Sequence, residues 1–166
     1  GLATLMYVQD NDGWLPSFKD GTFWSTKLSL YIGNKTCTWN WGWPSGTPKI
    51  VKNIFSCPSG KKELTWGINY MYNKRIGFYD PSWGYPTYST YAPRKLDRLQ
   101  KPSSLFLIID GRVTTLGGET GIDYDPSKVD YRHNNGANVL WADSHASWAS
   151  RSNIASWSAT VGWNPY

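Results

Sequence analysis

Residues 132–145 read RHNNGANVLWADSH. Large apolar residues alternate with smaller ones over this run, and turn-forming residues bound it on both sides. The pattern predicts a short strand over residues 137–143. Residues 145–149 predict a second strand, and the connection between the two is so short that they should pair antiparallel.

Outward from this hairpin, the chain predicts helices first and strands later. Residues 2–9 form an apolar, helix-like segment that the sequence DNDG should end, with Gly13 available for a left-handed conformation. Residues 22–32 predict a second helix that ends at Gly33. Strands are expected at residues 104–110 and 129–133. This order indicates an α+β fold with a small antiparallel sheet.

Aromatic residues make up 16% of the chain, with 11 Trp and 11 Tyr, which is too many for a single core. Trp39, Trp41 and Trp43 alternate in a segment that is either a strand edge or an aromatic loop. Residues 77–93 are rich in Tyr, Pro, Gly and Ser and predict a long ordered loop. Exposed rings of this kind bind sugar faces or mark protein interfaces, although core packing or packing of the loop on itself explains them better.

Length and charge exclude several classes of protein. A chain of 166 residues is most simply one domain, residues 1–166, with enough length for a sizeable core. The formal charge is +5, but lysines and arginines are scattered and form neither a dense stripe nor a nucleic-acid-binding module. The basic residues therefore predict a solvated face, which would also suit anionic lipid head groups.

The hairpin segment resembles the C-terminal H-x9-D-G segment of a family of pseudopilin-like proteins related to type II secretion pseudopilins. His133 and Asp143 occupy the His and Asp positions, and Ser144 stands where the family usually has Gly. If that Gly has a positive φ, either Ser144 is strained or the turn here differs from that of the family. Four further segments resemble the family in the same order: residues 5–16 (LMYVQDNDGWLP), 55–59 (FSCPS), 66–70 (WGINY) and 101–110 (KPSSLFLIID).

The resemblance implies a non-enzymatic structural subunit of a pilus-like fibre. In that family a hydrophobic N-terminal helix anchors the subunit in the inner membrane, and the head lies in the periplasm or at the cell surface. No run here reaches the roughly 18 apolar residues of a membrane span, so we expect that helix upstream of residue 1. Residues 2–9 would be the end of the long helix, packed on the sheet. The expected partners are other pseudopilin subunits, the assembly machinery and secretion cargo. A glycan-binding module that uses Trp39, Trp41 and Trp43 is the alternative function.

The two cysteines, Cys37 and Cys57, fit a single disulfide that closes a loop of 19 residues (38–56). An oxidising periplasm, which the resemblance implies, would favour this bond. Two free thiols are the alternative. Neither cysteine has a partner at a C-x2-C spacing, so their spacing gives no zinc motif.

Motifs for catalysis are absent from the sequence. There is no Gly-x-Ser-x-Gly, no phosphate-binding loop and no His-Glu-x-x-His, and the only glutamates are Glu63 and Glu119. No spacing singles out a pair of carboxylates for glycoside hydrolysis. The sequence therefore predicts that the chain is not an enzyme.

His133 and Asp143 are expected to form a structural latch between the hairpin and the strand before it. A strand over residues 137–143 spans about 23 Å at ~3.3 Å per residue, so a direct pair requires His133 to approach from an adjacent strand. Bonding of His133 to the backbone near the turn is the alternative. With His145 the two residues could also supply three ligands of a zinc site, which we consider the weaker interpretation.

Calcium is the one cofactor that the resemblance suggests, because major pseudopilins bind it through loop oxygens. Asp123, Asp125 and Asp130 could supply such hard ligands. Asp10 and Asp12 could do the same, but the sequence after them departs from an EF-hand loop, and a helix stop explains them better.

Overall fold

The computed structural model describes residues 1–17, 24–33, 54–55, 57–60, 69–76, 94–111, 121–122 and 125–157. Within these ranges the chain is an α+β protein built on one sheet. The strands are β1 (Tyr70–Asn73), β2 (Phe106–Asp110), β3 (Gly121–Ile122), β4 (Gly136–Trp141) and β5 (Ala146–Ser150). The helices are α1 (Leu2–Asp10), α2 (Trp24–Ser29) and α3 (Arg151–Ser156). Short 3-10 helices are η1 (Leu30–Ile32), η2 (Lys74–Ile76), η5 (Leu96–Arg98), η6 (Pro102–Ser104) and η7 (Pro126–Lys128).

The sheet has the strand order β3-β1-β2-β4-β5. Strands β1, β2, β4 and β5 pair antiparallel, and the two-residue β3 lies parallel to β1. The predicted hairpin is confirmed, since β4 and β5 pair from Gly136↔Ser150 to Leu140↔Ala146. A shift of register interrupts the pairing of β2 with β4 between Phe106 and Ile108.

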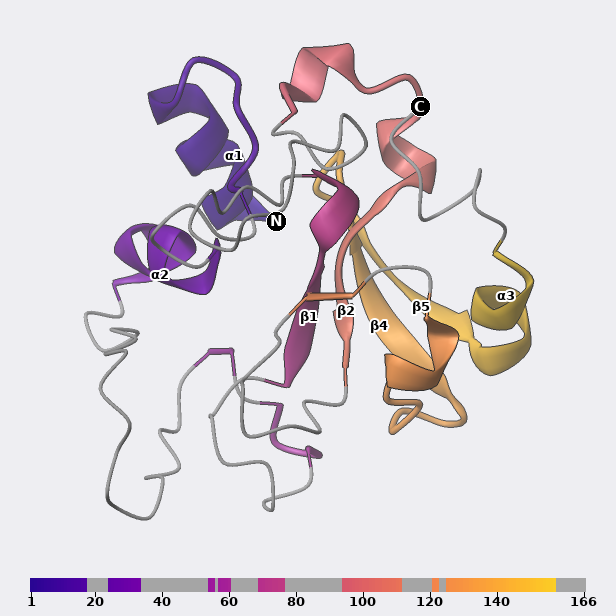
Figure 1. The fold of residues 1–166 in the computed structure, drawn as a ribbon. Coiled ribbons are helices and arrows are strands. Elements are labelled where there is room, and N and C mark those ends of the chain that lie inside the picture. The colour runs from indigo at the N-terminus through magenta and orange to yellow at the C-terminus, as the bar shows by residue number, and fades with distance from the viewer. Residues whose placement is uncertain are drawn as a thin grey trace, which may run out of the picture.

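Helices cover the sheet on both sides, with α1 and α2 on one side and α3 on the other (Figure 1). Two clusters of buried side chains follow from this layering. The cluster under α1 and α2 includes Trp24, Leu28, Tyr72, Leu105 and Leu107. The cluster under α3 includes Met71, Phe106, Ile109, Val139 and Ile154. The shift of register in β2 allows the neighbouring Leu107 and Ile108 to pack on the same cluster, against the usual alternation.

The ends of the first two helices agree with the sequence. Gly13 has a φ of 82°, and its N–H donates to the carbonyl oxygen of Val8 at 2.9 Å. Gly33 ends η1 with a φ of 68°. In both places a left-handed residue redirects the chain after a helix, the position where glycine is favoured. α1 is nine residues long, so the described part of the chain does not contain a long N-terminal helix.

The strand predicted at residues 129–133 is wrong. That segment makes only isolated bridges, between Val129 and Gly111 and between His133 and Gly136. Both edges of β4 are already paired, with β2 and β5, so the segment crosses the end of the sheet instead. The prediction also missed β1 and α3. Among the described residues, no helix is long and apolar enough to span a membrane.

Candidate functional site

Three side chains with metal-ligating or nucleophilic atoms converge at one end of the sheet. They are Asp110 at the end of β2, His133 in the turn before β4, and Cys57 in a turn that lies beside the start of β1. Their ligand atoms all lie within 4.8 Å of one another. We call these three residues the Cys57 cluster.

Local hydrogen bonds fix each residue of the Cys57 cluster. The N–H of Cys57 donates to Oδ1 of Asn69 at 3.0 Å, which ties its turn to β1. The N–H of Asn138 in β4 donates to Oδ2 of Asp110 at 2.7 Å. His133 exchanges backbone hydrogen bonds with Gly136, and its carbonyl oxygen accepts from Trp148 Nε1 at 2.8 Å.

Two short contacts within the Cys57 cluster are made by the same atom, Nε2 of His133. Nε2 of His133 lies 3.5 Å from Sγ of Cys57 and 3.5 Å from Oδ2 of Asp110. A catalytic Cys-His-Asp relay uses one ring nitrogen for the thiol and the other for the carboxylate. Here both neighbours face the same nitrogen, so the geometry does not form such a relay.

A buried arginine lies next to the cluster. Nη2 of Arg132 donates to the carbonyl oxygens of Asn69 and Gly111, each at 2.9 Å. Its Nε lies 3.2 Å from the carboxylate of Asp130, and Nη2 lies 3.9 Å from Oδ1 of Asp110. Because the guanidinium is fastened to two backbone carbonyls, it holds the ends of β1 and β2 together as well as balancing charge.

Burial dominates the electrostatics of the site. It raises the pKa of Asp110, while the hydrogen bond from Asn138 and the charges of Arg132 and His133 oppose that rise. Burial, together with the neighbouring Cys57 and Asp110, raises the pKa of Tyr70 to about 12. Tyr70 is therefore a neutral hydroxyl at physiological pH.

The predicted direct pair of His133 with Asp143 does not form in the described part of the chain. The two residues lie at opposite ends of β4, which keeps their side chains apart. The side chain of His133 contacts Cys57 and Asp110 instead. Asp143 pairs with His145, whose Nδ1 lies 2.6 Å from Oδ1 of Asp143.

The other predicted sites are placed as follows. Cys57 is a free, buried cysteine in this structure. Cys37, its predicted disulfide partner, lies outside the described residues, so the disulfide stays a prediction. The thiol of Cys57 faces His133 rather than the surface. Trp39, Trp41 and Trp43, the predicted aromatic surface, also lie outside the described residues.

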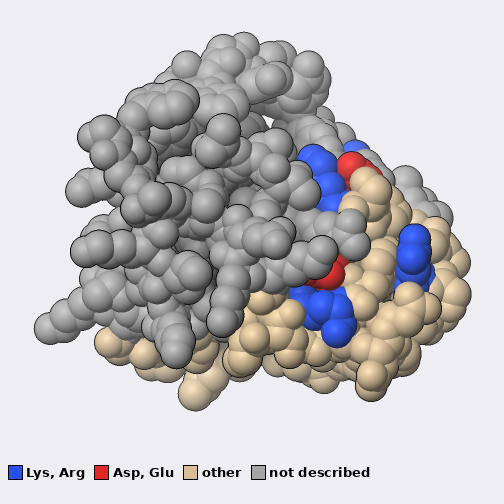
Figure 2. All heavy atoms as spheres, turned by 90° about the horizontal axis from the view of Figure 1, so that it is seen from below, with Lys and Arg blue, Asp and Glu red and all other residues tan. Residues whose placement is uncertain are grey.

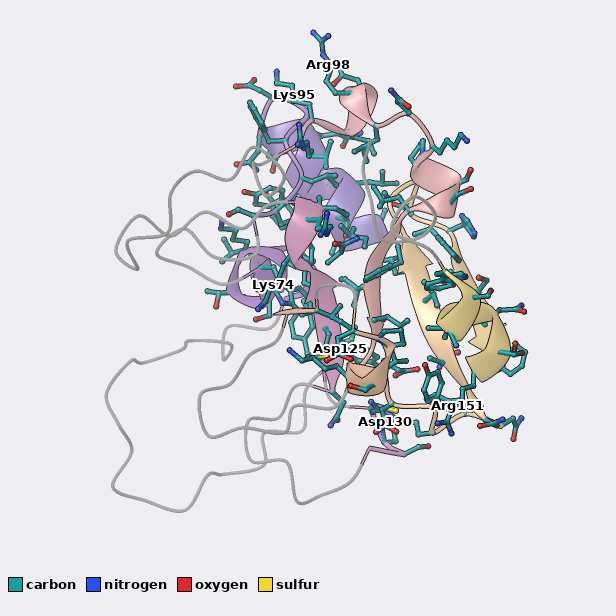
Figure 3. The ribbon with its side chains drawn as sticks, turned by 45° about the vertical axis from the view of Figure 1, so that its right-hand side comes forward. Lys74, Lys95, Arg98, Asp125, Asp130 and Arg151 are labelled. Carbon is teal, nitrogen blue, oxygen red and sulfur yellow. The ribbon has the colours of Figure 1, made fainter. Side chains whose placement is uncertain are left out.

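The calcium candidates are brought only partly together. Asp125 and Asp130 lie at the same end of the sheet (Figure 3), and Asp123 lies outside the described residues. Oδ1 of Asp125 accepts from the N–H of Ser127 at the start of η7, and Asp130 pairs with Arg132. Each of the two carboxylates thus already has a protein partner that explains its position.

The turn between β4 and β5 confirms the expected strain at Ser144. Ser144 has a φ of 74°, in the left-handed region that favours glycine. The turn also lies directly against the start of α1, because a Cβ at Gly1 would fall 2.5 Å from the carbonyl oxygen of Ser144. Ser144 therefore packs on the start of α1.

The outer face of α1 is apolar in its first half, whereas Gln9 and Asp10 are exposed and polar at its end. Thr4 and Val8 are buried under the helix, but Leu2, Leu5 and Met6 are 74%, 37% and 40% exposed. Below the helix, a mostly apolar cavity of about 300 Å³ extends to β1, β2, β4 and β5. A surface helix normally carries polar residues on its outer side, so the exposed Leu2, Leu5 and Met6 make the first half of α1 unusual.

Charged residues on the surface are dispersed. On the face drawn in Figure 2, lysines and arginines of the described residues form separate patches rather than a continuous stripe. Lys95 and Arg98 lie at the end of the molecule away from Asp125 and Asp130 (Figure 3). The ammonium of Lys95 lies 5.4 Å from the centre of the Trp14 ring, so part of this charge covers an exposed aromatic side chain.

Comparison of the chain with protein-family models, with curated proteins and with solved structures found no match. The function must therefore be argued from the sequence and from the geometry above. Sequence reasoning had not connected Asp110 and Arg132 with His133. The one signal for Asp110 was an acidic residue at the end of an otherwise apolar strand, FLIID.

Proposed function

We propose that this chain is the globular head of a pseudopilin-like structural subunit, which acts by assembly into a short fibre and not by catalysis. The ordered resemblance of five segments to that family is the starting point. A hydrophobic helix upstream of α1 would anchor the subunit in the inner membrane, with the head in the periplasm or at the cell surface. Its partners would be other pseudopilin subunits, the assembly machinery and secretion cargo.

The observation that carries the proposal is the apolar patch of Leu2, Leu5 and Met6 on the first half of the outer face of α1. Leu2, Leu5 and Met6 project from the helix although its opposite side is already packed on the protein. Exposed apolar side chains gathered on one helix mark a surface that another molecule covers. In a fibre, that molecule would be the corresponding helix of a neighbouring subunit.

The position of the motif supports the same function. The β4–β5 turn, which contains Asp143 and Ser144, lies against Gly1 at the start of α1. A fibre subunit needs a fixed angle between its helix and its head, because a small change of angle accumulates along the fibre. The contact at Ser144 is placed where it would set that angle.

Cysteine cross-linking in cells tests the proposal. In the full-length protein, Cys introduced for Leu2 or Met6 should give a disulfide-linked dimer on mild oxidation, because neighbouring α1 helices would lie together. The matched control is Ala155→Cys, an exposed position on α3 at the other side of the sheet. Oligomers that form equally from the control position, or that fail to form from both α1 positions, would refute the fibre model.

A further inference from the structure

We infer that the Cys57 cluster is a zinc site, in which Cys57 Sγ, His133 Nε2 and a carboxylate oxygen of Asp110 bind one Zn²⁺ and a water molecule completes a tetrahedron. A thiolate, an imidazole and a carboxylate form a ligand set that suits zinc and is too soft for calcium or magnesium. This inference does not depend on the proposed function of the head.

The spacing of the ligand atoms fits a tetrahedral ion. With ordinary zinc–ligand bond lengths, the edges of the tetrahedron are ~3.6 Å between nitrogen and sulfur and ~3.4 Å between nitrogen and oxygen. The distances from Nε2 of His133 are 3.5 Å to Sγ of Cys57 and 3.5 Å to Oδ2 of Asp110. Two neighbours that converge on one ring nitrogen are difficult to explain as two good hydrogen bonds, because that nitrogen offers a single donor or acceptor site.

An unsatisfied carboxylate oxygen is the second, independent observation. Asp110 is completely buried, and its Oδ1 has no hydrogen-bond partner. A buried carboxylate oxygen without a partner is costly and requires a cation or a donor beside it. Among the described residues, Arg132 is the cation nearest to Oδ1, but its Nη2 is 3.9 Å away and donates to two backbone carbonyls. The other oxygen, Oδ2, accepts from Asn138 and lies 3.5 Å from His133, so the carboxylate retains an oxygen that is free to bind an ion.

Charge balance favours a divalent ion at this place. Arg132 lies beside two carboxylates, Asp110 and Asp130, so one guanidinium faces two acidic side chains. A Cys57 thiolate would add a further negative charge. Zn²⁺ would balance the negative charge and would also stabilise the thiolate.

The surroundings supply support for the ligands and a route for the ion. The N–H of Asn138 orients the Asp110 carboxylate, and the turn bonds with Gly136 orient His133. The side chain of His133 is 27% exposed, so an ion can reach the cluster from solvent along the imidazole. Cys57 and Asp110 close the inner side.

The test uses the 166-residue chain without a polyhistidine tag. Equilibrium dialysis should give one Zn²⁺ per chain, and addition of Zn²⁺ to the metal-free protein should raise its melting temperature. Replacement by Co²⁺ should give the intense visible bands of a four-coordinate ion and a thiolate-to-cobalt charge-transfer band. That band requires a cysteine ligand, so it tests the site in the wild-type protein even if a variant does not fold.

Variants assign the ligands. Cys57→Ser, Asp110→Asn and His133→Gln should each weaken zinc binding at least ~100-fold. Replacing a residue that only hydrogen-bonds to a metal ligand already lowers metal affinity about 10- to 100-fold. The matched control is His145→Gln, which alters the other histidine of the chain, itself paired with Asp143, and should leave binding unchanged.

Three results would overturn the inference. They are a zinc content well below one per chain, a cobalt complex without the charge-transfer band, and loss of binding in His145→Gln with retention in His133→Gln. Thiol counting on the denatured, unreduced protein gives a fourth criterion. A Cys37–Cys57 disulfide in the native protein would remove the thiolate and with it the site.

Discussion

At the scale of single residues, Ser144 is the clearest point of strain. Its φ of 74° places a side chain in a conformation that L-residues other than Asn and Asp rarely adopt. Its hydroxyl is buried without a hydrogen-bond partner. Both features are costs that glycine would avoid, and they agree with the resemblance to a family that usually has Gly at this position.

Ser144→Gly should therefore stabilise the protein by about 1 kcal/mol, the scale of one relieved left-handed residue. Urea unfolding at neutral pH measures the change. Asn134→Gly and Asn135→Gly are matched controls, because both residues also have positive φ but asparagine tolerates it better. A gain for the Asn variants that equals or exceeds the gain for Ser144→Gly would show that strain at Ser144 is not the cause.

Tyr72 gives a second prediction, which concerns pH. The ring is fully buried, its hydroxyl donates to the carbonyl oxygen of Pro16, and burial holds its pKa well above 10. The unfolded chain loses this proton near pH 10, whereas the folded protein retains it. The proton linkage therefore contributes stability that is present below pH ~10 and is lost as the pH rises further.

Tyr72→Phe should cost about 1–2 kcal/mol at neutral pH, because it leaves a buried carbonyl oxygen without its donor. Above pH ~10 the wild type should lose stability that the variant keeps, so the difference between them should narrow. Denaturation curves at pH 8 and pH 10.5 measure it. A difference in stability between wild type and Tyr72→Phe that stays constant from pH 8 to pH 10.5 would contradict the raised pKa of Tyr72.

Residue-scale prediction from sequence succeeded where a conformation is local and failed where a partner is distant. The left-handed conformation of Gly13 and the helix end at Gly33 followed from turn chemistry within a few residues of the chain. The contact of His133 with Cys57 joins residues 76 positions apart, which no local pattern encodes. The expected partner, Asp143, was near in sequence but lies beyond the length of a strand.

At the scale of elements, alternation and turn residues were sufficient to predict the β4–β5 hairpin. They were insufficient for β1, whose four residues, YMYN, are almost entirely buried and show no alternation. α3 was missed because it has only six residues and a single buried one, Ile154. Its signal was local, since Ser150 caps the helix by accepting from the N–H of Asn153.

Gly136 gives a prediction for this hairpin. A Cβ at position 136 would fall 2.4 Å from the Trp148 ring and 2.5 Å from the carbonyl oxygen of Ala149. Because one of these atoms belongs to the backbone of β5, the strand cannot simply rotate a side chain away. Gly136→Ala should therefore destabilise the protein by about 1–3 kcal/mol in urea unfolding.

Asn138→Ala is the control for Gly136→Ala. Asn138 lies on the same strand and is exposed, and alanine retains the N–H that donates to Asp110. Its effect should stay within about 0.5 kcal/mol. If Gly136→Ala changes the free energy of unfolding as little as Asn138→Ala does, then β5 does not approach β4 closely at position 136.

At the scale of the whole molecule, the sheet separates two hydrophobic clusters and brings the ends of β1, β2 and β4 together around Cys57, Asp110 and His133. The α+β class followed from the order of elements along the chain. The composition of the Cys57 cluster did not, because it depends on which strands become neighbours in the order β3-β1-β2-β4-β5. Strand order is a property of long-range pairing, and local periodicity does not determine it.

The final prediction concerns assembly of the head. The 166-residue chain should be monomeric at micromolar concentration, although α1 carries exposed Leu2, Leu5 and Met6. Three partly exposed side chains cover much less than the ~800 Å² per partner that a stable interface requires, so in the proposed fibre an upstream helix would supply most of the contact. Sedimentation velocity measures the oligomeric state of the 166-residue chain.

The variant Met6→Glu tests whether the outer face of α1 contributes to assembly in addition to the proposed upstream helix. It should leave the sedimentation of the isolated head unchanged, because there is no dimer to disrupt, and it should abolish the oligomers that Leu2→Cys forms in the full-length protein. The reason is that a carboxylate on the outer face of α1 would be buried without a partner when a neighbouring helix covers it. A tight dimer of the isolated head, or oligomers that survive Met6→Glu, would move the interface away from α1 to another surface of the protein.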